Sequence, residues 1–158
     1  MSNTITSDIV YQLINVGDPS LSPNGARMAF AKSSIDHESM ETVSHVMMMD
    51  VASGESSRFT NGNKDSGPRF SPDGKTLAFS RPDSNGRKQL WAIPSAGGEA
   101  LKLTNVPGGI TDVAWSPDSG SLAFVSDVDP DLLPDDHDPK IDPRVLEVHR
   151  IRRDPSDY

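Results

Sequence analysis

The sequence predicts an all-β fold: an incomplete β-propeller with two full four-stranded antiparallel blades, part of a third, and a short N-terminal helix. The main observation is one phrase of the form Ser-Pro-(Asp/Asn) that recurs three times, at Ser22–Ala31, Ser71–Ser80 and Ser116–Val125. The serines that begin the three copies are separated by 49 and then by 45 residues. A period of roughly 40–50 residues, built from short strands and tight turns, is typical of propeller blades.

A second phrase has nearly the same period. His45–Asn61 realigns on Gln89–Asn105 at an interval of 44 residues. A β-sandwich is the alternative all-β fold, because its strands also alternate apolar and polar residues. Sandwich strands seldom repeat one turn phrase at a fixed interval, so two phrases repeating in the same order favour the propeller.

The first phrase predicts a β-hairpin. Proline presets φ near the value that the second turn position needs, and glycine takes the positive φ that ends the turn. Gly25, Gly74 and Gly120 are the expected glycines. The strand after each turn places Leu or Met and Phe on one face and Ala on the other, which indicates burial on both faces, as where blades stack. These strands contain Met28–Phe30, Leu77–Phe79 and Leu122–Phe124.

The second phrase predicts the outer half of each blade. A strand around Met47–Met49, or Leu90–Ile93 in the next repeat, pairs with one around Phe59 or Leu101–Leu103. Ser53-Gly54 and Gly97-Gly98 supply the turns between them. The segment Ser33–Thr42 is long and polar, and it leaves the boundaries of the first blade open.

These patterns divide the chain into a lead-in helix, residues 1–16, and a propeller fragment, residues 17–158. Blades are expected at about 17–61, 66–105 and 110–158, with alternating residues Asp142–Ile151 forming an outer strand of the third. Ser7 or Thr6 caps the lead-in helix, whose apolar face would pack on the outside of the first blade and contains Ile9, Val10, Leu13 and Ile14. Known propellers close with about 4–8 blades, so we expect an N-terminal fragment of a longer protein.

Composition excludes several classes of function. The 158 residues are 34% hydrophobic and 24% charged, which is typical of a globular chain. There is no cysteine, and hence neither a disulfide framework nor a cysteine-based metal site. The net charge of −8 argues against nucleic-acid binding, and the only local basic cluster is Arg150, Arg152 and Arg153. No segment reaches the length of a membrane span or resembles a secretory signal, so a cytoplasmic location is expected.

The acidic run Asp127–Asp138 is the strongest candidate for metal binding. Counted from Asp127, Asp129 and Asp131 fall at positions three and five of a calcium loop and Asp138 at twelve. The glycine required at position six is Leu132, and the last ligand is Asp in place of bidentate Glu. A solvated loop explains the run better, and whether it binds calcium stays open.

The remaining candidates favour structural roles. His37, His45, His137 and His149 lie apart, without metal-ligand spacing, although His137 is flanked by two aspartates. Met47–Met49 point to alternate faces of a strand, which favours core packing over a soft metal site. Trp91 and Trp115 lie in apolar strands and are expected in the core. We therefore assign no catalytic, cofactor-binding or metal residue, and predict no cofactor.

From about Asp8 onward the chain resembles a known family. Val16–Gly25, followed by SPDGKTLAFSR, LWAIPSAGGEALKLTN and VAWSPDSGSLAFVSD, is similar to the start of a prolyl-oligopeptidase (S9) family serine peptidase of the acylaminoacyl-peptidase and dipeptidyl-peptidase type. The resemblance implies an N-terminal propeller followed by a catalytic α/β-hydrolase domain. The serine of that domain lies in a G-x-S-x-G elbow, a motif that this sequence lacks.

The resemblance implies a non-catalytic, gating role for these residues. The propeller would admit short peptides to the hydrolase domain and exclude folded proteins, and the parent protein would hydrolyse the short peptides through a serine nucleophile. Whether that parent is a homo-oligomer stays open. The alternative is a stand-alone propeller that acts as a protein-binding scaffold, because the repeat phrase is also similar to the PD40 repeats of TolB. TolB-like proteins carry a signal peptide and an α/β domain first, whereas here the first repeat begins within about twenty residues.

Overall fold

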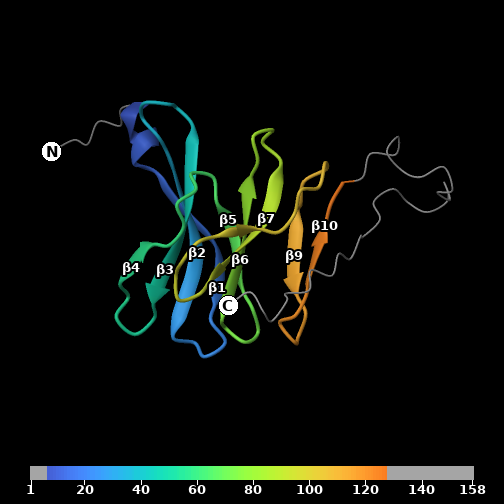
Figure 1. Ribbon diagram of the computed structural model, residues 1–158. Coiled ribbons are helices and arrows are strands. Elements are labelled where there is room, and N and C mark those ends of the chain that lie inside the picture. Colours follow the sequence, from blue (N-terminus) through green and yellow to red (C-terminus); the bar gives the residue numbers. More distant parts are fainter. Residues whose placement is uncertain (1–6, 128–158) are drawn as a thin grey trace, which may run out of the picture. The chain divides into compact units, whose positions relative to one another are not determined.

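The computed structural model describes residues 7–127, which form three antiparallel sheets that follow one another along the chain (Figure 1). The first sheet has the strand order β1-β2-β3-β4, the second β5-β6-β7-β8, and the third pairs β9 with β10. The first contains β1 (Ile14–Leu21), β2 (Arg27–Ile35), β3 (Thr42–Asp50) and β4 (Ser56–Arg58). The others contain β5 (Ser66–Phe70), β6 (Thr76–Pro82), β7 (Lys88–Pro94), β8 (Leu101–Lys102), β9 (Asp112–Trp115) and β10 (Leu122–Val125). The prediction of an all-β, four-stranded antiparallel architecture is confirmed.

The chain divides into two compact units, with the boundary between Pro68 and Arg69. The first unit holds the first sheet. The second unit holds β6 to β10, so the packing of the third sheet on the second can be followed inside one unit.

The N-terminal segment forms a 3₁₀ helix, η1 (Ser7–Gln12), where the sequence predicted a helix with an apolar face reaching Ile14. Ile14 instead begins β1. Its six residues make two turns, which is longer than the 3–4 residues typical of a 3₁₀ run. Ile9 and Val10 remain 41% exposed, so the apolar face is only partly covered.

The serine of the repeated phrase fixes each hairpin turn. In the second sheet the Ser71 hydroxyl donates to the Asp73 carboxylate (2.5 Å) and accepts the amide of Thr76 (3.0 Å). The main chain closes the same turn, because the Ser71 amide donates to the Thr76 carbonyl and the Gly74 amide to the Ser71 carbonyl, both at 2.8 Å. Asn24 replaces the aspartate in the first sheet and accepts the Ser22 hydroxyl at 2.8 Å.

In the third turn the residue with positive φ is Ser119, and the prediction for Gly120 is wrong. Gly25 and Gly74 have φ of 71° and 72° as predicted, and Ser119 has φ of 61° at the equivalent position, three residues after the serine. The sequence prediction placed the positive φ at the glycine, whereas the turn requires it at the third residue after the serine. The Ser119 hydroxyl also accepts the amide of Asp73 (3.0 Å), a contact between two repeated turns that glycine would not make.

The polar segment between β2 and β3 is a tight turn. Asp36 accepts the amide and the hydroxyl of Ser39 at 2.9 and 2.8 Å, and the Asp36 amide donates to the Glu41 carbonyl. The turn after β3 uses the same bonds, with Asp50 accepting both groups of Ser53. Thus Asp-x-x-Ser-x-Glu occurs twice, 14 residues apart, and the first sheet has no long excursion between β2 and β3.

Register gives each central strand two apolar faces. In the second sheet Leu77 pairs with Ile93 and Phe79 with Trp91 on one face, while Ala78 pairs with Ala92 on the other. Leu77, Phe79 and Ala78 are at most 1% exposed. The predicted burial on both faces is confirmed for this strand.

We expect Gly25→Ala to destabilise the protein by about 1–2 kcal/mol, because a side chain at positive φ is strained. A Cβ at Gly25 would have no atom within 4 Å, so the cost is conformational and not steric. Gly17→Ala is the matched control, since Gly17 has the same open surroundings without a positive φ. Urea denaturation of the protein that carries this chain measures both variants, and equal losses would contradict the explanation.

Candidate functional site

Threonine hydroxyls complete the third strand of the first two sheets at the point where the fourth strand ends. The amide of Val46 on β3 donates to the Thr60 hydroxyl (3.2 Å), and the amide of Leu90 on β7 donates to the Thr104 hydroxyl (2.8 Å). Thr60 and Thr104 are 2% and 8% exposed. The side chain thus satisfies a buried amide that no backbone partner reaches, which avoids a cost of about 1–3 kcal/mol.

The residue before each of these amides, Gln89 or His45, holds the loop that follows the fourth strand of its sheet. Gln89 accepts the Thr104 hydroxyl (2.9 Å) and the Val106 amide (3.1 Å), and donates to the Val106 carbonyl (3.0 Å). In the first sheet His45 takes this place, with its Nδ1 2.8 Å from the Gly62 carbonyl. Val106 and Gly62 are equivalent in the 44-residue register. His45 therefore has a structural role, and the repeated Thr-Asn pair was the sequence signal for this network.

Thr104→Val should destabilise the protein by about 1–3 kcal/mol, because the buried Leu90 amide and the Gln89 side chain each lose a partner. Thr104→Ser keeps the hydroxyl and should cost clearly less. Thermal unfolding of the two variants checks this. A valine variant as stable as the serine variant would show that the hydroxyl is dispensable.

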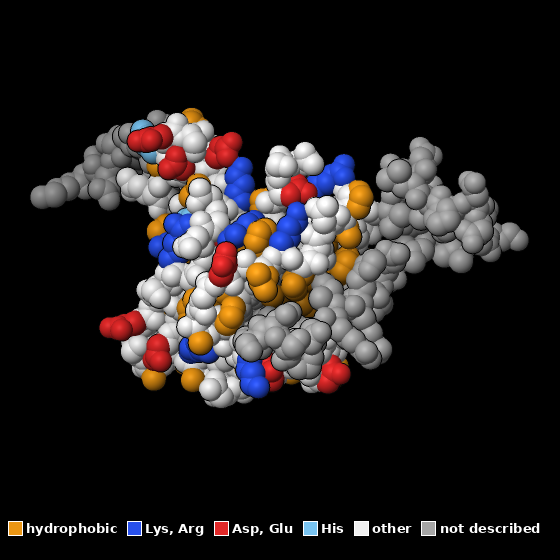
Figure 2. Space-filling view, viewed as in Figure 1, with side chains coloured by type: hydrophobic (Ala, Val, Ile, Leu, Met, Phe, Trp, Pro, Cys, Tyr) orange, Lys and Arg blue, Asp and Glu red, His pale blue; other side chains and the backbone are white. Residues whose placement is uncertain are grey.

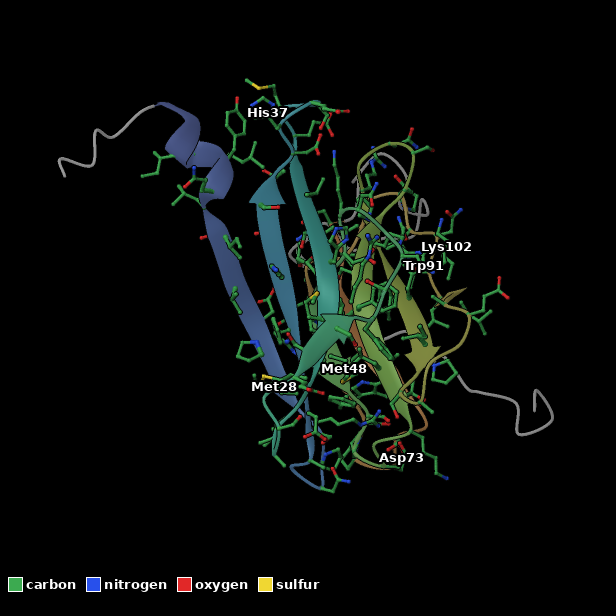
Figure 3. All side chains as sticks on the ribbon, turned by 90° about the vertical axis from the view of Figure 1, so that its left-hand side faces the viewer. Met28, His37, Met48, Asp73, Trp91 and Lys102 are labelled. Carbon is green, nitrogen blue, oxygen red and sulfur yellow. The ribbon has the colours of Figure 1, made fainter. Side chains whose placement is uncertain are left out.

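A cation–aromatic cluster on the second sheet is the candidate site with the most concentrated recognition chemistry. We call Phe79, Arg81 and Trp91 the Arg81 cluster. The Arg81 guanidinium carbon lies 4.7 Å from the centroid of the Trp91 ring and 5.3 Å from that of Phe79. Lys102 on β8 pairs with Trp91 in register, and Figure 3 shows the two side by side. Such contacts hold a positive charge in a fixed place, at about 0.5–2 kcal/mol each.

The carboxylate of Asp83 lies close to this cluster in sequence and shapes the turn from β6 to β7. It accepts the amides of Asn85 (2.9 Å) and Arg87 (3.1 Å), and its second oxygen accepts the Gln89 amide group (3.3 Å). Desolvation raises the pKa of Asp83, but these hydrogen bonds and the charge of Lys102 together lower it below the ordinary value of 3.8. The arrangement can hold charges and orient polar groups, which is recognition chemistry and not bond cleavage.

Two other turn carboxylates have lowered pKa values. The amide and then the hydroxyl of Ser39 lower the pKa of Asp36, and Ser53 does the same for Asp50. In each case hydrogen bonds stabilise the ionised form.

A lowered folded-state pKa means that these carboxylates stabilise the fold at pH values above their unfolded pKa, near 4. Stability should therefore fall as the pH drops through the folded pKa values, below 3.8. Asp50→Asn keeps an acceptor for Ser53 but does not titrate, as Asn24 already does in place of Asp73. The variant should lose less stability than the wild type between pH 5 and pH 3 in urea titrations, and parallel profiles would contradict the assignment.

The other residues singled out from the sequence have packing roles where the structure describes them. His37 packs against Tyr11, with ring centroids 4.5 Å apart and ring planes tilted by 50°. The Trp115 indole donates to the Arg69 carbonyl (3.0 Å) and its ring packs against the buried cluster of Leu122 and Phe124. Met48 is 9% exposed, while Met47 and Met49 on the opposite face are half-buried. Trp91 is half-buried and its indole nitrogen is buried without a hydrogen-bond partner.

Asp127 is exposed at the end of the described segment, so the acidic run Asp127–Asp138, weighed above as a calcium loop, lies almost wholly outside it. His137, His149, the three arginines from Arg150 and the strand predicted at Asp142–Ile151 also lie outside. Between residues 7 and 127 no three His, Asp or Glu side chains gather in a way that would hold a metal. Red and blue side chains are interspersed on the face shown in Figure 2. Within the same range, no helix has the length and apolar character needed to cross a membrane.

The three sheets, their repeated turns and their two-faced strands define a β-propeller type of chain. The model of the TolB β-propeller domain family, PD40, matches residues 9–131, and the chain therefore belongs to that family.

Curated relatives include peptidases. The chain is 38% identical over 123 residues to the uncharacterized peptidase YuxL of Bacillus subtilis, covering 77% of this chain and 19% of that protein. It is 25% identical over 142 residues to dipeptidyl-peptidase 5 of Porphyromonas endodontalis, covering 89% and 20%. The chain thus spans about a fifth of the length of these two relatives.

Solved structures show the same fold. The acylaminoacyl peptidase of Pyrococcus horikoshii superposes with a TM-score of 0.65 at 23% identity, covering 82% of this chain and 21% of that one. A putative TolB from Agrobacterium tumefaciens gives a TM-score of 0.57 at 27% identity, covering 73% and 39%.

Proposed function

We propose that this chain is part of the propeller of a longer serine peptidase that hydrolyses short peptides. The main support for this proposal is the 38% identity to a peptidase across 77% of the chain, together with the fold shared with acylaminoacyl peptidases. In this proposal the first two sheets are complete blades, at about 17–61 and 66–105, and β9 and β10 begin a third. Catalytic residues belong to the remaining length of the protein, which for the relatives is about four fifths.

The role assigned to these residues is to limit access to the active site. The described side chains support this assignment because buried hydroxyls, fixed turns and the Arg81 cluster hold each sheet in one geometry. A rigid ring over an active site admits small substrates and excludes folded or long ones. The Arg81 cluster supplies a fixed charge, which suits the positioning of a polar substrate or of a neighbouring loop.

The full-length protein should hydrolyse chromogenic acyl-peptide or dipeptide substrates and react covalently with a fluorophosphonate. Short peptides should be cleaved at least tenfold faster than an unfolded polypeptide of a hundred residues or more, because access is limited by size. The matched control is the variant with Ala in place of the serine of the G-x-S-x-G elbow. Equal cleavage of short and long chains would refute gating, and a protein without hydrolysis or labelling would refute the peptidase assignment.

A protein-binding scaffold is the second candidate, favoured by the 27% identity to a TolB structure and by the family match. It predicts a full-length protein that lacks the nucleophile elbow and any fluorophosphonate labelling. The same two assays therefore separate the candidates.

A further inference from the structure

Two side chains of the turn between β2 and β3 hold the 3₁₀ helix η1 at one end of the first sheet. The Tyr11 hydroxyl donates to the Met40 sulfur (2.7 Å), and the Tyr11 ring lies against His37. Figure 3 labels His37 at this end of the sheet. All three residues belong to the first unit, in which η1 also contacts β2. Tyr11 therefore joins two segments that lie 29 residues apart in sequence.

Met40 is the most exposed methionine of residues 7–127. Its side chain is open to solvent, at 68% exposure, although its sulfur is in contact with Tyr11. The other methionines in this range are part of β2 and β3. Met48 is 9% exposed, and the half-buried ones are Met28, Met47 and Met49.

The backbone of Met40 is one that glycine would adopt without strain. Met40 has φ of 59°, and Gly54 has φ of 73° at the same position of the turn after β3. Side chains are disfavoured at such a φ because Cβ approaches the following carbonyl oxygen. The first turn thus carries a strained methionine whose sulfur bonds to η1, where the second turn carries no side chain at all.

The chemistry of an exposed thioether is oxidation by peroxides. A thioether sulfur has two lone pairs, and the Tyr11 hydroxyl occupies only one of them. With hydrogen peroxide the sulfur attacks one oxygen, an S–O bond forms and the O–O bond breaks. The hydrogen of the transferred oxygen passes to the departing oxygen, which leaves as water. Methionine is oxidised by two electrons to the sulfoxide, and a methionine sulfoxide reductase reverses the change.

We propose that Met40 is a site of reversible oxidation by hydrogen peroxide, and that its oxidation loosens η1 from the turn between β2 and β3. The sulfur of a sulfoxide carries a partial positive charge and is no longer an acceptor for the Tyr11 hydroxyl. Its oxygen attracts water and the hydroxyl instead, so the contact between the Tyr11 oxygen and the sulfur is lost. The inference goes beyond the proposed function and holds for a peptidase and a scaffold alike.

The first test treats the full-length protein with dilute hydrogen peroxide and follows each methionine by peptide mass spectrometry. Met47 and Met49 are the internal controls, because they lie on β3 between β2 and β4. Oxidation at Met40 should be roughly fivefold or more faster than at either control, since its sulfur is reached from solvent. Rates that agree within a factor of about two would overturn the assignment of the site.

The second test measures millisecond hydrogen exchange of the peptide that covers η1, before and after oxidation of the full-length protein. Exchange should become roughly threefold faster in the oxidised wild type, because local protection depends on contacts that stay closed. Met40→Leu is the matched control, since leucine is apolar and forms no sulfoxide. Unchanged exchange in the wild type, or an equal increase in peroxide-treated Met40→Leu, would overturn the coupling.

Tyr11→Phe examines the same contact without any oxidant. This variant keeps a ring beside His37 and lacks the hydroxyl that bonds to the sulfur. Untreated Tyr11→Phe should therefore already show the faster exchange of η1, and peroxide should add little to it. Exchange equal to that of the untreated wild type would show that the hydroxyl does not hold η1, and the coupling would fall.

Discussion

A serine hydroxyl that makes two hydrogen bonds at once sets the geometry on which the sheets depend. Ser71 bonds the carboxylate two residues later and the amide five residues later, and Ser22 bonds Asn24 and the Arg27 amide in the same way. Both bonds hold the two strands of a hairpin in one register. A slip by one residue would exchange the face that carries Leu and Phe for the face that carries Ala along the whole strand. Stacking of sheets therefore rests on a turn of six residues.

The same hydrogen-bonding role is filled by different residues in different repeats. Asn24 accepts the hydrogen bond of the turn serine as Asp73 does. His45 contacts the loop after the fourth strand as Gln89 does. At the positive-φ position of the turn from β2 to β3 stands Met40, with φ of 59°, where the turn after β3 has Gly54. These three positions require, in turn, a hydrogen-bond acceptor, a side chain that holds the loop, and a left-handed backbone. More than one residue type meets each requirement.

The features that could be predicted from the sequence are those that depend on one position and its immediate neighbours. The all-β class, the strand after each turn and the positive φ of Gly25 and Gly74 follow from local chemistry that the phrase itself contains. The positive φ of Ser119 was missed because a glycine follows it directly. The prediction assigned the positive φ to that glycine and not to the equivalent position of the turn. Thr60 and Thr104 were visible only as a repeated pair, since their role depends on a strand partner 14 residues away. The Arg81 cluster needed the register of β6 and β7, which no local pattern states.

Strand order follows chain order in both four-stranded sheets, so every strand pairs with its immediate neighbour in sequence. All main-chain ladders of the first sheet are complete once the chain has reached Arg58. Contacts this local form quickly, and they allow a growing polypeptide to fold one sheet at a time behind the ribosome. Inside the second unit, the buried cluster between the second and third sheets cannot be completed until β10 has been synthesised.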